Sequence, residues 1–179
     1  MLHYHPGHSL GDANCIRRLN ITNGENAGWA ERKKWEELFH RLSYPFPTLM
    51  VDRVEEVERE KKIKAIKWIT ANEFYLAGHF PGQPIVPGVL TLEGMIQSAL
   101  ILVGESFSRG KIGGYLQKVD RVRFKRAIIP GDRVEFLVSL TGQDGDLWTF
   151  KGKAQVGEET AAEATLILKV MIREVGFEL

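Results

Sequence analysis

The sequence contains very little cysteine and almost no excess charge of either sign. Its 179 residues include one cysteine, Cys15, so no second thiol is present to form an internal disulfide. This composition fits a reducing compartment, and we expect a cytoplasmic protein. The formal net charge is +1, which argues against bulk binding to nucleic acid, so we expect no nucleic-acid partner.

Long uninterrupted hydrophobic runs are also missing. The longest apolar segment, residues 89–103, contains Glu93 and Gln97 and is shorter than the roughly 20 residues that a membrane-spanning helix needs. The first residues carry histidine and glycine instead of a basic flank and an apolar run, so we expect no signal peptide and no membrane association. With 44% hydrophobic residues, the chain is long enough for one domain with a core.

The N-terminal part shows no regular hydrophobic period. Residues 1–27 are rich in glycine, asparagine and histidine, and are predicted to form a loosely ordered arm before a single domain at 28–179. His3, His5 and His8 lie in this arm without a carboxylate or cysteine frame, so no metal site is predicted. Apolar residues in 29–42 recur every three and four positions, which predicts a short leading helix.

The remaining hydrophobic pattern alternates between strands and one helix. Alternation predicts strands at 49–59, 63–69, 115–125, 134–140, 148–156 and 164–172. Between the second and third lies an apolar segment, 89–104, predicted to be a helix with Pro87 in its first turn and Gly104 as its stop. Because this helix is apolar on nearly every face, we expect it to be buried all round. The order predicts an α+β fold, an antiparallel sheet wrapped around a central helix.

Two side chains in and near that helix are of the kind that moves protons. His79 lies in a loop rich in proline and glycine, residues 78–82, and imidazole titrates near neutral pH, which suits a general base. Glu93 lies within the apolar helix, where an uncharged, protonated carboxyl group is favoured, which suits a general acid. Gln97 follows one helical turn later on the same face and is a candidate partner for Glu93.

The sequence resembles the β-hydroxyacyl-acyl carrier protein dehydratases of the FabZ type from about residue 44 to about residue 173. The resemblance is carried by residues 78–82, by 87–90 with Glu93 and Gln97, by Tyr115 and 123–126, and by 130–132. It implies a hot-dog fold and a homodimer whose two active sites are each built from both protomers, with a hexamer built from such dimers left open. The substrate would be carried on the phosphopantetheine of acyl carrier protein, and no cofactor is expected.

The resemblance and the chemistry together assign roles to particular residues. The implied reaction converts a (3R)-hydroxyacyl-acyl carrier protein to the trans-2-enoyl product in fatty acid biosynthesis. His79 would be the base at C2, Glu93 the acid at the C3 hydroxyl, and the backbone N–H of Gly88 the donor to the thioester oxygen. Supporting residues would be Gln97, Phe80 and Ile85, and the acyl tunnel would be lined by Tyr115, Val89 and Leu92.

A group of basic residues follows the helix. Lys118, Arg121, Arg123, Lys125, Arg126 and Arg133 lie within or beside one predicted strand. Residues at odd positions of a strand share a face, so we expect a positive patch that docks the acidic acyl carrier protein. A solvated sheet edge, kept soluble by its charge, is the alternative for any single residue.

Other functions on the same fold remain open. The related isomerising dehydratases carry aspartate at the position of Glu93, so glutamate favours the non-isomerising type. A hot-dog acyl thioesterase would need a carboxylate that activates water, which the His79 loop disfavours. A non-catalytic acyl-binding module could dispense with His79 or Glu93, and both are present.

Overall fold

The computed structural model describes residues 48–107 and 111–173. The predicted arm at 1–27, the predicted leading helix at 29–42 and the three histidines at positions 3, 5 and 8 lie outside the described residues.

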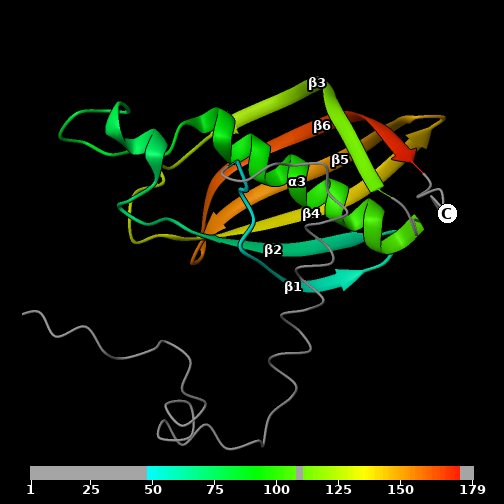
Figure 1. The fold of residues 1–179 in the computed structure, drawn as a ribbon, viewed down its shortest axis with the longest axis horizontal. Coiled ribbons are helices and arrows are strands. Elements are labelled where there is room, and N and C mark those ends of the chain that lie inside the picture. Colours follow the sequence, from blue (N-terminus) through cyan, green and yellow to red (C-terminus); the bar gives the residue numbers. More distant parts are fainter. Residues whose placement is uncertain (1–47, 108–110, 174–179) are drawn as a thin grey trace, which may run out of the picture. The chain divides into compact units, whose positions relative to one another are not determined.

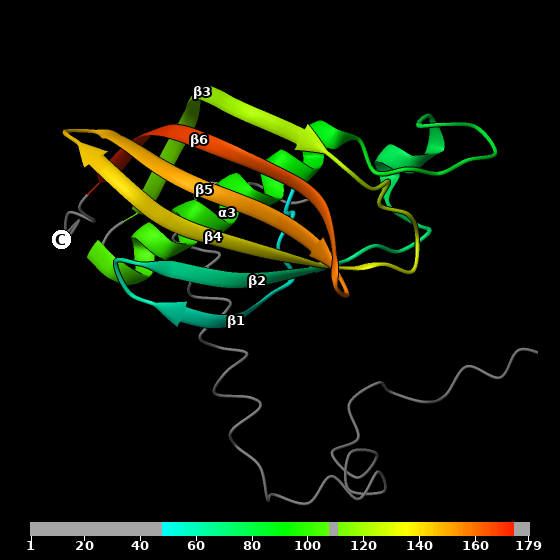
Figure 2. The same cartoon turned by 180° about the vertical axis from the view of Figure 1, so that it is seen from behind.

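Within this part of the chain, six strands form one antiparallel sheet. Along the sequence they are β1 (Arg53–Glu58), β2 (Lys62–Trp68), β3 (Lys111–Phe124), β4 (Arg133–Asp144), β5 (Leu147–Val156) and β6 (Glu159–Arg173). The order across the sheet is β1-β2-β4-β5-β6-β3, and every neighbouring pair is antiparallel. A long helix, α3 (Gly88–Phe107), lies against one face of the sheet (Figures 1 and 2).

The core lies between α3 and the inner face of the sheet. Strand β4 alternates as predicted, with Val134, Phe136 and Val138 at 1% exposure each, and Phe150 of β5 is fully buried. All residues of α3 from 94 to 104 are buried, because the helix packs against β2 to β6. The predicted antiparallel sheet around a central helix is therefore confirmed.

The ends of α3 differ from the prediction. The helix begins at Gly88, and the carbonyl of Pro87 accepts the N–H groups of Leu90 and Thr91 at 2.9 and 3.3 Å, so Pro87 precedes the helix. Gly104 does not stop it, since α3 continues to Phe107. The missing side chain of Gly104 instead makes room for Ile112, whose Cδ1 would lie 2.4 Å from a Cβ there. The first turn is not buried all round either, since Val89 is 70% exposed.

The strands were predicted in the right number and order, but their bounds and one short element were missed. β3 begins at Lys111, before two glycines that hide its pattern, and β4 continues to Asp144. A short 3-10 helix, η1 (Phe74–Ala77), precedes the His79 loop and was not predicted.

The length of α3 also corrects an expectation. By length and composition alone, Gly88–Ser106 would suffice to cross a membrane, with a mean hydropathy of 1.3, but 67% of that window is buried inside the protein. Burial against a sheet is typical of a core helix, so this segment is weak support for a membrane span.

Close approach of α3 to β4 depends on Gly94, and we predict that Gly94→Ala destabilises the fold. A Cβ at this position would lie 2.2 Å from Cζ of Phe136, whose ring is buried and cannot move aside. Overpacking of this kind costs about 1–3 kcal/mol. Urea denaturation should show the loss for Gly94→Ala and a change below about 0.5 kcal/mol for Gly142→Ala, where the nearest atom would be 3.9 Å away. Equal stability of the two variants would contradict this packing.

Candidate active site

The loop that carries His79 is closed by its own backbone. The N–H of Phe80 donates to the carbonyl of Gln83, and the N–H of Gln83 donates back to Phe80, both at 2.9 Å. The N–H of Ile85 donates to the carbonyl of His79 at 2.8 Å. Gly82 has φ +77°, a conformation that favours glycine, so the turn depends on this residue. The loop therefore presents His79 in one defined position.

The hydrogen bond of the His79 ring fixes its tautomer when the ring is neutral. Its Nδ1 lies 2.9 Å from the carbonyl oxygen of Ile85. A carbonyl can only accept a hydrogen bond, so Nδ1 carries the proton and Nε2 keeps a free lone pair. The ring also stacks on Phe80, with the ring centroids 4.2 Å apart. The structure thus brings both predicted supporting residues of the loop, Phe80 and Ile85, to His79 and leaves Nε2 as the basic atom.

A pocket of about 550 Å³ opens beside His79. Its wall comes from the loop, the start of α3, the end of β3 with the turn after it, and the start of β6. The residues that line it are His79, Ile85, Val86, Gly88, Val89, Thr91, Phe124, Lys125, Arg126, Ala127, Ile128, Ala161 and Ala162. Four residues of the loop and the helix start, His79, Ile85, Gly88 and Val89, were predicted from the sequence as site residues. Ala161 and Ala162 were not predicted, because they follow more than 70 residues after the helix start and only the order of the strands in the sheet brings them to this pocket.

The start of α3 offers backbone donors to this pocket. The N–H groups of Gly88 and Val89 come before the first donors of the helix and have no acceptor among the described residues. Such groups, at the positive end of the helix dipole, favour a developing negative charge. A Cβ on Gly88 would lie 2.8 Å from Cε1 of Phe124, so glycine lets the Phe124 ring lie close to the helix start.

Gln97 holds Glu93 in one orientation. The Gln97 side chain is fully buried, and its Nε2 donates to Oε1 of Glu93 at 2.9 Å and to the carbonyl of Thr48 at 2.8 Å. Its Oε1 accepts the N–H of Met50 at 2.7 Å. Because an amide nitrogen only donates, Oε1 of Glu93 must be an acceptor. Oε2, which has no hydrogen-bond partner among the described residues, is the oxygen that can carry a proton.

Within one protomer the structure does not bring the two predicted catalytic groups into one pocket. Glu93 is not among the residues that line the His79 pocket, and neither are Leu92 and Tyr115 of the predicted tunnel. Tyr115 lies on β3 opposite Lys169 and is 49% exposed. Val89 does line the pocket. The predicted meeting of His79 with Glu93 therefore requires a second protomer and stays a prediction.

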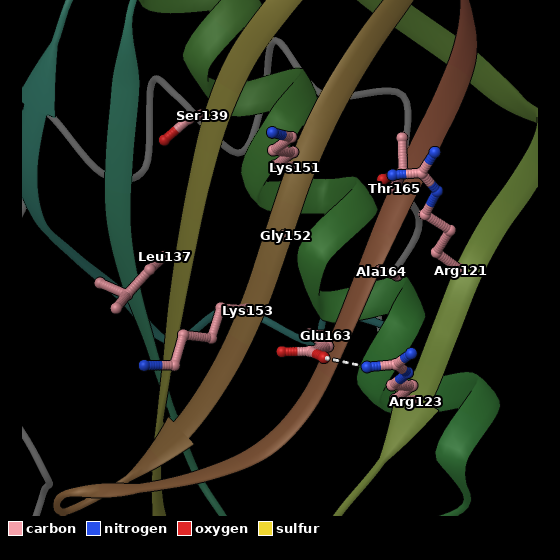
Figure 3. A pocket seen from close by; sticks show the side chains of 10 residues that line it. All are labelled: Arg121, Arg123, Leu137, Ser139, Lys151, Gly152, Lys153, Glu163, Ala164 and Thr165. Carbon is pink, nitrogen blue, oxygen red and sulfur yellow. Dashed lines mark ion pairs between the residues drawn. The ribbon is translucent and has the colours of Figure 1, made fainter.

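The predicted basic patch is divided between two places. Arg121 and Arg123 line an open groove of about 660 Å³ on the outer face of the sheet, together with Lys151 and Lys153 (Figure 3). Lys125 and Arg126 instead line the His79 pocket. The division falls where β3 ends at Phe124, so Lys125 and Arg126 come after the strand and do not follow its alternation.

The two remaining members of that set already have acidic partners. Lys118 lies 3.7 Å from Asp120, and Arg133 pairs with Glu55 and Glu135 across β1, β2 and β4. In the groove, Arg123 faces Glu163 at 3.9 Å (Figure 3). Lys151 and Lys153 were missed, although their alternation along β5 predicts that they point outward.

Arg126 has a structural role in the pocket wall. Its guanidinium donates to both oxygens of Asp132, at 2.6 and 3.1 Å, and its Nε lies 2.9 Å from Glu159. Burial raises the pKa of Asp132, but the hydrogen bonds from Arg126 and from the N–H of Ile129 outweigh this and lower it overall. Arg126 therefore holds the turn after β3 in place and is not a free cation for docking.

No metal centre is evident in the part of the chain that the structure describes. There, no three histidine, cysteine, aspartate or glutamate side chains are placed to hold a metal ion. The expected absence of a cofactor remains a prediction.

Comparison with known proteins shows the family. The profile of the FabA-like domain matches residues 42–165, and the chain belongs to this family. It is 43% identical over 141 residues to the 3-hydroxyacyl-[acyl-carrier-protein] dehydratase FabZ of Verminephrobacter eiseniae, covering 76% of this chain and 91% of that protein. The resemblance drawn from the sequence is thereby confirmed.

Solved structures support the fold. The dehydratase heterocomplex ApeI:P from Xenorhabdus doucetiae is similar with a TM-score of 0.61 and 17% identity, over 74% of this chain and 89% of that one. A hypothetical thioesterase with coenzyme A from Streptococcus pneumoniae is similar with a TM-score of 0.57 and 10% identity, over 78% and 98%. The hot-dog fold is confirmed, and the likeness to both a dehydratase and a thioesterase shows that the fold alone does not decide the reaction.

Proposed function

We propose that this protein removes water from (3R)-hydroxyacyl-acyl carrier protein to give the trans-2-enoyl product in fatty acid biosynthesis. The observation that carries the proposal is the His79 ring, whose Nδ1 donates to Ile85 and whose Nε2 is left free beside the unpaired N–H groups at the start of α3. The dehydratase FabZ relatives support the same reaction.

The reaction needs two proton transfers and one stabilised charge. His79 Nε2 takes a proton from C2, and the electrons of that C–H bond pass toward the thioester carbonyl, whose oxygen becomes negative. The N–H groups of Gly88 and Val89 stabilise this oxygen. As the electrons return to form the C2–C3 double bond, the C3–O bond breaks, and Glu93 gives its proton from Oε2 to the departing hydroxyl, which leaves as water.

The proposed catalytic unit is a homodimer in which Glu93 of one protomer meets the His79 pocket of the other. Three large apolar side chains near the pocket are exposed in the single chain: Val89 at 70%, Phe80 at 54% and Phe124 at 54%. Strand β3 is the last in the sheet order, so one of its backbone edges is unpaired in the sheet, and its Tyr115 is half exposed. Exposed edges and apolar patches favour association with a second chain. A hexamer built from such dimers remains the alternative.

The proposed function is tested by incubating the protein with a 3-hydroxyacyl-acyl carrier protein and following the enoyl thioester by absorbance. We expect a trans-2-enoyl product with the thioester intact, formed without added metal or cofactor. Release of a free carrier thiol would instead indicate a thioesterase, a cis-3 product an isomerising dehydratase, and tight binding without turnover a non-catalytic module. Each of these three results would overturn the proposal.

Docking of the carrier protein is proposed at the C-terminal half of β3, which joins the outer groove to the His79 pocket. Arg121 and Arg123 line the groove and Lys125 lines the pocket, so an acidic partner placed here would be next to the site. The double substitution Arg121→Glu and Arg123→Glu should raise KM for the carrier-linked substrate about tenfold. The expected kcat change is small, because neither side chain lines the His79 pocket.

Two controls separate docking from chemistry. KM for a short synthetic thioester without a carrier should not change in the double variant. Lys62→Glu, on β2 and outside both pockets, should leave KM for both substrates unchanged. An unchanged KM for the carrier-linked substrate in the double variant would contradict docking at this strand.

We also propose a cytoplasmic location, which fits the single cysteine and the FabZ relatives.

A further inference from the structure

A buried lysine bridges two carboxylates near the C-terminal end of β2, the end from which the chain continues to the His79 loop. Lys67 of β2 is 8% exposed, and its Nζ lies 2.8 Å from Oδ1 of Asp52 and 3.4 Å from Oε1 of Glu73. A buried ammonium group is costly unless it is paired, and here it has two acidic partners. These three residues are called the Lys67 triad below.

Asp52 is the fixed end of the triad. Its second oxygen, Oδ2, accepts the N–H of Trp68 at 2.7 Å, and its own N–H donates to the carbonyl of Ile66 at 2.8 Å. Both carboxylate oxygens of Asp52 are therefore bound to β2, Oδ1 to the Lys67 side chain and Oδ2 to the backbone of Trp68. This leaves Lys67 held firmly to the sheet, with one further acceptor, Glu73, to which it can bind.

Glu73 is the end of the triad that leads toward the proposed active site. It occupies the N-cap position of η1, but its side chain makes no capping hydrogen bond, because the carboxylate is directed to Lys67. Its backbone carbonyl accepts the N–H of Leu76 at 3.0 Å, and the carbonyl of Leu76 accepts the N–H of His79 at 3.4 Å. A continuous series of contacts thus runs from the Lys67 ammonium group through Glu73 and Leu76 to the backbone of His79.

We propose that Lys67 and Glu73 are positioning residues for His79: their ion pair ties η1 to β2 and so sets where the histidine loop lies. This inference rests on the proposed function of His79 as a base. Among the described residues, Lys67 is the charged partner of the Glu73 side chain, which is only 17% exposed and makes no capping hydrogen bond. Neither residue contacts the reacting atoms, so their effect passes through the position of the imidazole.

Tyr75 shows how tightly this region is enclosed. Its hydroxyl is buried and has no hydrogen-bond partner among the described residues. Burial raises the pKa of the Tyr75 phenol, and the nearby charges of Glu73 and Asp52 raise it further, so the hydroxyl stays protonated. Lys67 and Glu73, whose side chains are 10% and 17% exposed, are also largely shielded from water, so the loss of their ion pair is poorly compensated by solvent.

The test compares Glu73→Ala with Glu73→Gln, whose amide oxygen can still accept a hydrogen bond from Lys67. Misplacing a catalytic group by about 1 Å can cost 10²-fold in rate, so we expect Glu73→Ala to lower kcat about 10- to 100-fold with KM changed less than about twofold. Glu73→Gln should recover most of the loss. The matched control is Lys64→Met, because Lys64 lies on the same strand and also bridges two carboxylates, Glu55 at 3.3 Å and Glu135 at 3.2 Å, away from the loop. Its kcat should be unchanged.

A second readout does not depend on turnover. Nitrogen NMR of ¹⁵N-histidine-labelled protein, with the His79 signal assigned from His79→Ala, reports which ring nitrogen carries the proton. In the parent protein and in Lys64→Met the neutral ring should be protonated at Nδ1, as the bond to Ile85 requires, and in Glu73→Ala it should become a mixture of both tautomers.

The two readouts separate this inference from the proposed function. A parent protein without dehydratase activity, in which Glu73→Ala still changes the His79 tautomer, would reject the function and keep the positioning role. An unchanged tautomer in Glu73→Ala, whatever its kcat, would overturn the positioning role. So would an equal loss of kcat in Glu73→Ala and in Lys64→Met, since that would show a general effect of removing ion pairs.

Discussion

His79→Ala is expected to lower kcat for dehydration by about 10²- to 10⁴-fold, the usual contribution of a positioned general base. The variant loses the imidazole whose Nε2 keeps a free lone pair when the ring is neutral. KM should change little, because the pocket wall and the donors at the start of α3 are retained. The enoyl thioester absorbance assay measures both constants.

The loss in His79→Ala must not come from unfolding. The loop is closed by backbone hydrogen bonds between residues 79 and 85, which the substitution leaves in place, so the urea midpoint should stay close to that of the parent protein. Turnover within about tenfold of the parent would contradict the role of His79 as the base.

Glu93→Gln is expected to lower kcat to a similar degree, about 10²- to 10⁴-fold. The new amide oxygen can still accept the hydrogen bond that Gln97 donates at 2.9 Å, so the side chain keeps its orientation and loses only the acidic proton. Both constants are measured with the same assay, and the loss should appear in kcat and not in KM.

Glu105→Gln is the matched control for this substitution. Glu105 lies on the same helix, its side chain is 14% exposed, and its nearest charged partner is Arg59 at 3.8 Å, far along α3 from the first turn. Its kcat should equal that of the parent. A loss in Glu105→Gln as large as in Glu93→Gln would show that any neutralised carboxylate on α3 harms the enzyme, and would remove the case for Glu93 as the acid.

The fold was predictable because its two periods are distinct in the sequence. Alternating residues such as Val134, Phe136 and Val138 face the core, and the one apolar helix must be covered by them. What failed were features that depend on a distant residue. Gly104 was taken as a helix stop, although its missing side chain makes room for Ile112 on another element. Lys125 was placed with Arg121 and Arg123, although β3 ends at Phe124 and the chain then turns to the His79 pocket.

The site was predictable only where its residues are close in sequence. The His79 loop and the pair of Glu93 and Gln97 follow local patterns, and in the structure His79 contacts Ile85 and Gln97 contacts Glu93. The Lys67 triad could not be found this way, because Asp52, Lys67 and Glu73 meet through the pairing of β1 with β2 and the path of η1. The wall residues from β6 likewise depend on the sheet order.

Each active site is proposed to take His79 from one protomer and Glu93 from its partner. The most direct measurement mixes His79→Ala with Glu93→Gln, exchanges their subunits by mild denaturation and refolding, and assays dehydration. If sites are shared, each mixed dimer has one site with both substitutions and one with neither, so about a quarter of the parent activity should return. If both groups act within one chain, no mixed dimer has an intact site, and activity that stays at the level of the separate variants would contradict the account.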